Sequence, residues 1–338
     1  MVNFQKELRR KDLALTHTIV QTTNDKSLSP SPHPQDPAAL RKVGENERGI
    51  VVRGSRVLAT LAPFSDEIAI HPGALLGPGC KDLALSFCIP LSTPGLRTLC
   101  RESYSRPGDR FHHPLSSRFD EQDAFMLFDS VEVPWHRIFI NGNIEAHNSA
   151  LSRGWFPNVA QQTMIRAQTK LEFAHALATR MAAMVNDKAP VTQQLLGELA
   201  CYAELTRNGI ATAEAESHDY GTGAWFPAAG PMNTLRAMLP IWFPRVNEII
   251  RMIGSHNLLI TPSEAELQDE VIGPMVEQFL HGDPGVSTQE SIATYRLAWG
   301  FAASALGSRN EQYERSYLAT SPTSVRLVDQ FLPGTTSR

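Results

Sequence analysis

The spacing of apolar residues along the chain changes near Asn141. Between residues 45 and 140, short apolar and β-branched runs alternate with glycine and proline. Short strands separated by turns predict an antiparallel sandwich or barrel. The clearest runs are GIVVRGSRVLAT (49–60), EIAIHPG (67–73), LALSFCIPL (83–91) and AFMLFDSVEVP (124–134).

Beyond Asn141 the apolar positions recur at helical spacing, which predicts long amphipathic helices. The residues Pro262-Ser263-Glu264-Ala265-Glu266 are typical of a helix start, and the glycine and prolines of 227–231 predict a break. Helices are expected at 159–185, 192–217, 245–253, 263–280 and 288–317.

Three segments follow from these patterns, and together they predict an α+β protein. Residues 1–44 start with a short helix that runs into an extended segment, and they continue as a proline-rich connecting loop. Residues 45–140 are expected to form the β domain, and residues 141–338 a helical bundle.

The composition is that of an ordinary globular protein, because 42% of the residues are apolar and 20% are charged. The net charge of −4 gives no electrostatic reason to expect nucleic acid or an anionic membrane as a partner. The N-terminal sequence lacks the continuous apolar core of a signal peptide, and no apolar run is long enough to cross a bilayer. We therefore expect a cytoplasmic protein with no membrane partner.

The cysteines indicate neither a metal site nor a disulfide framework. Cys80, Cys88, Cys100 and Cys201 are widely spaced and form no CxxC pair. The first three could hold an iron–sulfur cluster, but their apolar neighbours favour buried, reduced thiols and no metal. Walker, GxGxxG, HExxH and GxSxG motifs are also absent from the sequence. Composition and periodicity alone therefore indicate no function.

Four longer strings resemble the 4-hydroxyphenylacetate 3-hydroxylase family, the oxygenase components of two-component flavin monooxygenases. They are LALTH (13–17), GIVVRGSRVLAT (49–60), HPLSSRFDEQDAFMLFDSVEVPW (113–135) and AWGFAASALGSRNEQYER (298–315). The resemblance implies an acyl-CoA dehydrogenase-like fold, in which a central antiparallel β-barrel over 45–140 is followed by a C-terminal helical bundle. It also implies reduced FAD (FADH2) as cofactor, a phenol as substrate, a flavin reductase as partner and a homotetramer.

In the family a helical domain precedes the LTH segment and supplies part of the phenol pocket. This sequence begins about a dozen residues before LTH, so we expect either a fragment or a short member of the family.

The resemblance assigns His17 as the base that faces the phenolic oxygen. An imidazole suits this role, because its ordinary pKa of about 6.5 lets it accept a proton near neutrality. Thr60 matches a threonine beside the flavin ring, where a hydroxyl can donate or accept a hydrogen bond. Thr23 stands where relatives bind the flavin with a glutamine. Gly73 and Ala74 fall in the loop that covers the substrate.

A second flavin-binding segment is implied at Gly254, Ser255 and Asn257, where the loop would approach the phosphates or the ribityl chain. Relatives are richer in glycine there, and Asn257 is expected to make the turn because asparagine tolerates left-handed backbone angles. His256 is interpreted as a local hydrogen-bonding residue.

The charged string around Arg118, Asp120, Glu121 and Asp123 resembles a carboxylate cluster, but we interpret it as ordering a turn, with Arg118 paired locally. The role of Arg309 is left open.

Two other functions stay open. A 4-hydroxybutyryl-CoA dehydratase would use an iron–sulfur cluster, for which His175 is suitably placed, but Ala182 stands where a cysteine ligand is expected. An inactive, oligomerising member of the family is the other alternative.

Overall fold

The computed structural model describes residues 1–25, 27–28, 32–151, 155–280 and 282–317, together with Val325 and Val328. The chain divides into two compact units. Unit 1 comprises Met1–Ser103 and Glu121–Trp155, and unit 2 comprises Tyr104–Asp120 and Phe156–Arg338.

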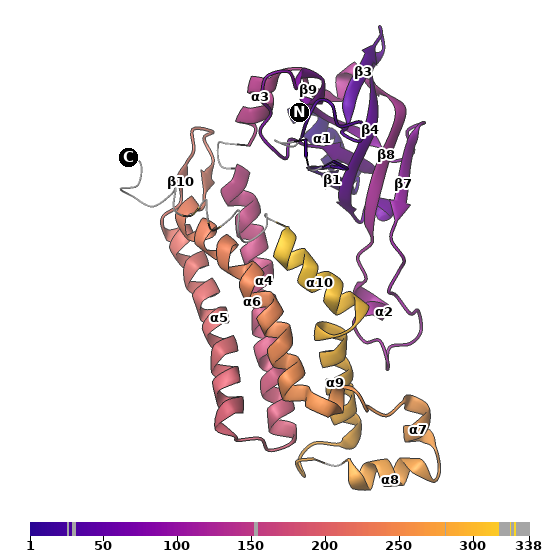
Figure 1. Ribbon diagram of the computed structural model, residues 1–338, viewed down its shortest axis with the longest axis vertical. Helices are drawn as coiled ribbons and strands as arrows, with labels where there is room; N and C mark the ends of the chain where they lie inside the picture. The colour runs from indigo at the N-terminus through magenta and orange to yellow at the C-terminus, as the bar shows by residue number, and fades with distance from the viewer. Residues whose placement is uncertain are drawn as a thin grey trace. The chain divides into compact units, whose positions relative to one another are not determined.

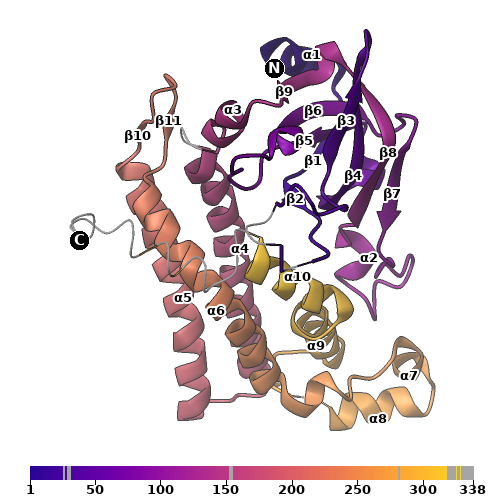
Figure 2. The ribbon, with the colours of Figure 1, turned by 45° about the horizontal axis from the view of Figure 1, so that its top comes forward.

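Unit 1 contains two sheets (Figure 2). The first has the order β1-β5-β6-β9 and the second the order β2-β4-β8-β7, with β3 also paired to β4. Every pairing is antiparallel except that of β1 with β5, which is parallel. The strands are β1 (Leu15–Thr18), β2 (Val20–Gln21), β3 (Arg41–Glu45), β4 (Gly49–Thr60), β5 (Glu67–Ile70), β6 (Leu85–Pro90), β7 (Leu96–Cys100), β8 (Asp123–Pro134) and β9 (Ile138–Asn141).

One apolar core joins the two sheets. Ile68 and Phe87 of the first sheet belong to the same buried cluster as Ile50 and Met126 of the second. Alternate side chains point to this core because successive strand residues face opposite sides of a sheet. The predicted strands are confirmed as strands. Among the described residues they form two separate sheets, and the predicted closed barrel is not confirmed.

Short helical elements complete unit 1. They are α1 (Val2–Lys11), α3 (Ile144–Ser149) and three single turns, η1 (Ala62–Phe64), η2 (Lys81–Leu83) and η3 (Trp135–Arg137). The predicted helix followed by an extended segment near the N-terminus is confirmed by α1 and β1.

The prediction of buried thiols is right for Cys80 and Cys88 and wrong for Cys100. Cys80 and Cys88 are buried free thiols, whereas Cys100 and Cys201 are exposed. Cys100 ends β7, a strand at the edge of its sheet, and Cys201 lies on the exposed side of a helix. Apolar sequence neighbours therefore do not guarantee that a cysteine is buried when it lies on an edge strand or on the exposed side of a helix.

Unit 2 is helical, and three long helices lie side by side in it (Figure 1). A single apolar cluster includes Leu171, Leu199, Phe243 and Ala298 from four of its helices. The helices are α2 (Ser116–Phe119), α4 (Trp155–Met184), α5 (Pro190–Ala215), α6 (Ala229–Gly254), η4 (Ser255–Leu258), α7 (Glu264–Gln268), α8 (Ile272–Phe279), α9 (Thr288–Ala302) and α10 (Ala305–Ser316); β10 (His218–Asp219) and β11 (Trp225–Phe226) form a small hairpin. No helix in the described ranges is long and apolar enough to span a membrane.

The helix predicted at 245–253 is much longer in the structure and begins at Ala229. Pro231 falls in its first turn, where a backbone N–H would have no partner within the helix, whereas Pro240 and Pro244 lie inside it. Burial of residues such as Trp242 and Val246 outweighs the lost backbone bonds. The prediction of a break at 227–231 therefore placed the helix start too late.

Two other predicted helices are interrupted. The segment 263–280 divides into α7 and α8 because the Asp269 carboxylate accepts hydrogen bonds from Val271 N and Ile272 N, at 2.9 and 2.8 Å. The segment 288–317 divides where Ser304 caps α10 through Gly307 N, at 3.1 Å. The predicted start at Ser263 is confirmed, since Ser263 and Glu266 form a reciprocal capping box.

A buried carboxylate holds α10 against α4. Glu314 accepts hydrogen bonds from Arg166 Nη2 at 3.0 Å and from Lys170 Nζ at 2.7 Å. Burial acts to raise the pKa of Glu314, but the two cations outweigh burial and hold it below its ordinary value.

Glu314→Gln is expected to destabilise the chain by about 3 kcal/mol, because it leaves two partly buried cations without their carboxylate. Urea denaturation followed by helical circular dichroism measures the loss. Glu277→Gln, at an exposed position of α8, is the matched control and should change stability by less than about 0.5 kcal/mol. Because the pKa of Glu314 is lowered on folding, its contribution is present above pH 4.5 and is lost as the pH falls through the lowered value. Equal effects of the two variants would contradict the structural role of Glu314.

Candidate active site

The parallel pair β1 and β5 places His17 beside a second histidine. His17 lies opposite Ala69 in the ladder, and His71 follows directly after β5. His71 N donates to Thr18 O at 3.2 Å, so the backbones stay paired up to His71. The two imidazole rings lie 6.4 Å apart between centroids, tilted by 50°.

Alternation along β1 explains why His17 is accessible. Thr16 and Thr18 are buried, and their hydroxyls donate to Thr60 O and Val57 O of β4, each at 2.7 Å. His17, between them, points to the other face and is exposed. The two threonines therefore fix the orientation of β1 and, with it, the direction of the imidazole.

Arg56 of β4 lies close to the same place. Its side chain is 1% exposed, and Nη1 donates to Ile19 O at 3.0 Å and, at the longer distance of 3.5 Å, to His71 O. Among the described residues, Nε has no hydrogen-bond partner and no carboxylate pairs with the guanidinium. Burial lowers the pKa of Arg56 to about 9. The side chain is therefore still charged at neutral pH.

Both imidazoles are held in their neutral form. Desolvation lowers the pKa of His17, since protein atoms surround part of its ring even though the side chain is accessible. The pKa of His71 falls to about 4, first through desolvation and then through the neighbouring His17 and Arg56. A neutral imidazole keeps a ring nitrogen that can accept a proton. This is the state that the predicted base requires.

Gly73 approaches the backbone of the segment after β1. A Cβ on Gly73 would lie 1.9 Å from Ile19 O, closer than any real contact. The loop is also tied to α3, because His147 Nε2 lies 3.2 Å from Ala74 O and Asn148 exchanges two hydrogen bonds with the backbone of Leu76, at 2.9 and 3.0 Å. The predicted substrate loop thus has a defined position beside β1 within unit 1.

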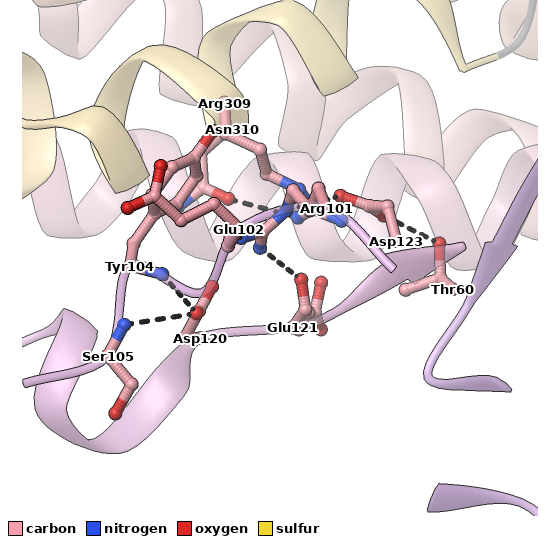
Figure 3. A network of polar contacts seen from close by, with 10 residues as sticks. All are labelled: Thr60, Arg101, Glu102, Tyr104, Ser105, Asp120, Glu121, Asp123, Arg309 and Asn310. Atoms are coloured by element: carbon pink, nitrogen blue, oxygen red, sulfur yellow. Dashed lines mark hydrogen bonds and ion pairs between the residues drawn. The ribbon is translucent and has the colours of Figure 1, made fainter. Parts of the chain in front are cut away.

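Thr60 ends β4, next to Thr16. Its hydroxyl donates to Asp123 Oδ1 at 3.1 Å, and Asp123 pairs in turn with Arg101 Nε at 3.3 Å (Figure 3). Arg101 also donates to the carbonyls of Glu102 and Glu121. The hydrogen of the Thr60 hydroxyl is thus used within the protein, and its oxygen lone pairs can still accept.

The charged string 118–123 makes structural contacts. Asp120 accepts from Tyr104 N at 2.8 Å and Ser105 N at 3.2 Å, and Arg118 Nε donates to Pro114 O at 3.3 Å (Figure 3). These contacts support the interpretation that the string orders a turn and that Arg118 pairs locally.

The other predicted flavin residues occupy separate parts of the chain. Thr23 is half-buried just after β2 in unit 1. In unit 2, Gly254 ends α6 with its Cα against Leu258, since a Cβ there would lie 2.6 Å from Leu258 Cγ. Ser255 has φ 47° and ψ −140°, a conformation that non-glycine residues rarely adopt.

The prediction that Asn257 makes a left-handed turn is wrong, because the positive φ falls on Ser255 instead. Asn257 lies in η4, and its amide donates to Tyr295 Oη at 3.1 Å. Asn257 and Tyr295 border a pocket of about 150 Å³ that also contains Thr261 and Met184.

Within the described ranges, no three His, Cys, Asp or Glu residues are grouped so as to hold a metal ion. His175 is a half-buried residue of α4, a helix in unit 2.

The sequence did not single out His71 or Arg56. The segment EIAI-His-Pro indicates which way His71 points, because Glu67, Ala69 and His71 lie on one face of the strand by alternation. Only the parallel pairing with β1 reveals that this face meets His17.

Two family models match the chain. They are described as "4-hydroxyphenylacetate 3-hydroxylase N terminal", over residues 1–140, and "4-hydroxyphenylacetate 3-hydroxylase C terminal", over residues 147–328. Among curated proteins, the 4-hydroxyphenylacetate 3-monooxygenase oxygenase component of Thermus thermophilus is 37% identical over 317 residues. That alignment covers 93% of this chain and 65% of the relative, so the chain spans about two thirds of that protein's length.

Solved structures give the same result. A crystal structure of the oxygenase component of 4-hydroxyphenylacetate 3-monooxygenase, complexed with FAD and 4-hydroxyphenylacetate, superposes with a TM-score of 0.91 at 35% identity. It covers 98% of this chain and 69% of that chain. Butyryl-CoA dehydrogenase from Megasphaera elsdenii superposes with a TM-score of 0.59 at 12% identity, over 97% of this chain and 70% of that one. The latter similarity concerns the fold alone, which is acyl-CoA dehydrogenase-like.

Gly73→Ala is expected to destabilise the β1 region by about 1–3 kcal/mol, because the added methyl overlaps Ile19 O and the backbone must shift. Hydrogen exchange of the β1 and β5 amides measures this local opening. Gly77→Ala is the matched control in the same loop, since a Cβ there meets no atom within 4 Å. Unchanged protection of β1 in Gly73→Ala would show that the loop does not rest on Ile19.

Proposed function

Because this chain belongs to the 4-hydroxyphenylacetate 3-hydroxylase family, we propose that it acts as the oxygenase component of a two-component flavin monooxygenase. The reaction introduces one oxygen atom of O2 into a phenol, ortho to its hydroxyl group. Family models over most of the chain support this proposal, as does the similar oxygenase solved with FAD and 4-hydroxyphenylacetate. A separate flavin reductase is the proposed source of reduced FAD, and a homotetramer is the proposed assembly.

The observation that carries the proposal is the state of His17. Its imidazole is accessible, neutral and held in a fixed direction by the buried threonines on either side. A phenol attacks an electrophilic oxygen far better once its hydroxyl proton has been removed. We assign that proton to a ring nitrogen of His17, which acts as general base.

Thr60 fits a reduced flavin. Reduced FAD, when bound, supplies the electrons that activate O2, and its ring carries N–H donors. Since the Thr60 hydroxyl donates to Asp123, its oxygen is available as an acceptor for such a donor. Thr23 in unit 1 and the segment Gly254, Ser255 and Asn257 in unit 2 are the other residues proposed to hold the cofactor.

Gly73 and Ala74 are proposed to lie against the substrate ring. Neither side chain carries a polar atom, so recognition by this loop rests on backbone groups and apolar contact. His147 and Asn148 keep the loop in place from α3.

His17→Asn is expected to lower hydroxylated product by about 100-fold or more, because a general base contributes 10²–10⁴-fold. FAD affinity should stay unchanged, and hydrogen peroxide from uncoupled oxidation should rise. Product and peroxide are measured with the full chain, a phenol and reduced FAD. His136→Asn, at an exposed histidine of unit 1, is the matched control and should behave as the unmodified chain. Unchanged coupling in His17→Asn would remove His17 from the mechanism.

The pH dependence of coupling should follow the lowered pKa of His17. A base acts only in its neutral form, so coupling should persist below pH 6.5 and fall as the pH drops through the lowered value. The ratio of product to peroxide against pH is the measurement. A midpoint at or above 6.5 would contradict the assignment.

A chain with no affinity for reduced FAD and no product would favour the inactive, oligomerising alternative.

A further inference from the structure

Helix α8 presents apolar side chains to solvent at the end of unit 2 where α4 ends (Figures 1 and 2). Ile272, Met275 and Phe279 recur at helical spacing and are all exposed, Phe279 at 70%. Among the described residues of α8, Gly273 alone is buried. A surface helix normally turns such a stripe toward the core. Within the described part of the chain, this stripe therefore lacks the cover that its pattern requires.

A pocket opens directly beside the stripe. Leu280, the residue that follows α8, borders the pocket of about 150 Å³ described above, together with Ile260 and Val185. These three side chains are exposed and form the mouth of the pocket, whereas Met184 and Ile292 are buried at its base. The pocket therefore leads from the exposed surface of unit 2 to its core.

Three polar residues of this pocket bond to one another. Asn257 Nδ2 donates to Tyr295 Oη at 3.1 Å, and Thr261 Oγ1 donates to Asn257 O at 2.7 Å. Covering a polar group with apolar atoms is costly mainly when the group has no hydrogen bond. A cavity of about 150 Å³ can hold a benzene ring. The pocket is therefore suited to the phenyl ring of a phenylalanine.

The exposed apolar area is that of a subunit interface. Six apolar side chains around the pocket and the stripe are each about half exposed, and a large apolar residue has about 200 Å² of surface, so together they expose roughly 600 Å². A standard interface takes about 800 Å² from each partner, of which about 65%, or about 500 Å², is apolar in homodimers. The six are Val185, Ile260, Ile272, Met275, Phe279 and Leu280. This patch is thus large enough for a stable dimer.

The charges near the patch disfavour a membrane surface as its occupant. Residues 263–283 contain six acidic residues and no lysine or arginine. Anionic headgroups attract basic segments, and an acidic segment is repelled. A protein surface that is itself apolar suits the patch better. A second copy of this chain supplies such a surface, together with a matching ring and pocket.

We propose that this patch is an interface between two copies of this chain, in which Phe279 of each copy enters the pocket of the other copy. A two-fold axis requires one surface to carry both halves of the contact, because residue i touches j and j touches i. Phe279 and the pocket meet this requirement, since Leu280 next to Phe279 belongs to the mouth of the pocket. The inference deepens the proposed homotetramer, on which the choice of partner partly rests, by naming the surface and its central contact.

Sedimentation of the full chain over a dilution series, without FAD, measures the association. The unmodified chain should self-associate reversibly. Phe279→Ser should weaken association by about 30-fold or more, because a buried aromatic anchor carries much of the binding energy of an interface. Ile260→Glu should have a similar effect, since it places a charge at the mouth of the pocket. Both residues are exposed, so helical circular dichroism should be unchanged.

Phe64→Ser is the matched control. Phe64 is 69% exposed, as Phe279 nearly is, but it lies in η1 of unit 1. This variant should associate as the unmodified chain does. An unmodified chain that stays monomeric overturns the interface, and so does association that is as tight in Phe279→Ser and Ile260→Glu as in the control.

A mixture of the two variants tests the contact itself. In a mixed dimer, Phe279 of the Ile260→Glu chain meets the intact pocket of the Phe279→Ser chain, so one of the two contacts is restored. If both contacts contribute equally, a 30-fold loss is reduced to its square root, and the mixture should associate about five-fold more tightly than either variant alone. A mixture that associates no better than either variant overturns the insertion of Phe279 into the pocket.

Three results separate this inference from the proposed function. A tetramer that persists unchanged in Phe279→Ser overturns this interface and leaves the proposed homotetramer. A chain that hydroxylates a phenol but whose association does not depend on Phe279 overturns the interface alone. A chain that associates through Phe279 but gives no product with reduced FAD overturns the hydroxylation and supports the interface.

Discussion

The parallel pairing of β1 with β5 determines which side chains of unit 1 meet. β1 has only four residues, yet its threonines bond to β4 while its backbone pairs with β5. The strand therefore joins the two sheets, and its register is fixed from both sides. A shift by one residue would turn His17 inward and Thr16 outward, because side chains alternate along a strand. Every assignment in unit 1 depends on that register.

Arg56 is an exception to the apolar packing of the neighbouring β4 residues in unit 1. Elsewhere β4 presents apolar residues such as Ile50 and Val52 to the core, whereas Arg56 buries a guanidinium whose hydrogen bonds, within the described part of the chain, go to backbone carbonyls. Replacing a buried charge by an apolar residue often stabilises a protein. A sequence under selection for stability alone has no reason to keep this arrangement. Sites that bind or transform ligands are where such local conflicts are expected.

The sequence predicted the elements far better than their pairing. Apolar, β-branched runs bounded by turn residues identified β4 and β8, and helical spacing identified α4 and α5. Helix ends were less predictable, because single side chains such as Asp269 and Ser304 decide them. His17 and Thr60 came from the family resemblance, and no local pattern marked them. His71 could not be placed beside His17, because residues about fifty positions apart meet only through a parallel pairing that neither segment encodes by itself.

The residues of the loop after β5 limit how substrates can be distinguished. Gly73 cannot carry a side chain because Ile19 O occupies that space, and Ala74 carries only a methyl group while its carbonyl faces His147. If a phenol lies against this loop, the loop can test its shape but offers no side-chain hydrogen bond. Polar discrimination within unit 1 would then fall to His17, which as a proton acceptor favours the oxygen that ionises most easily. Electron-withdrawing substituents make a phenol more acidic. This arrangement therefore favours acidic phenols over electron-rich ones at the binding step. Once ionised, however, electron-rich phenols react faster with an electrophilic oxygen.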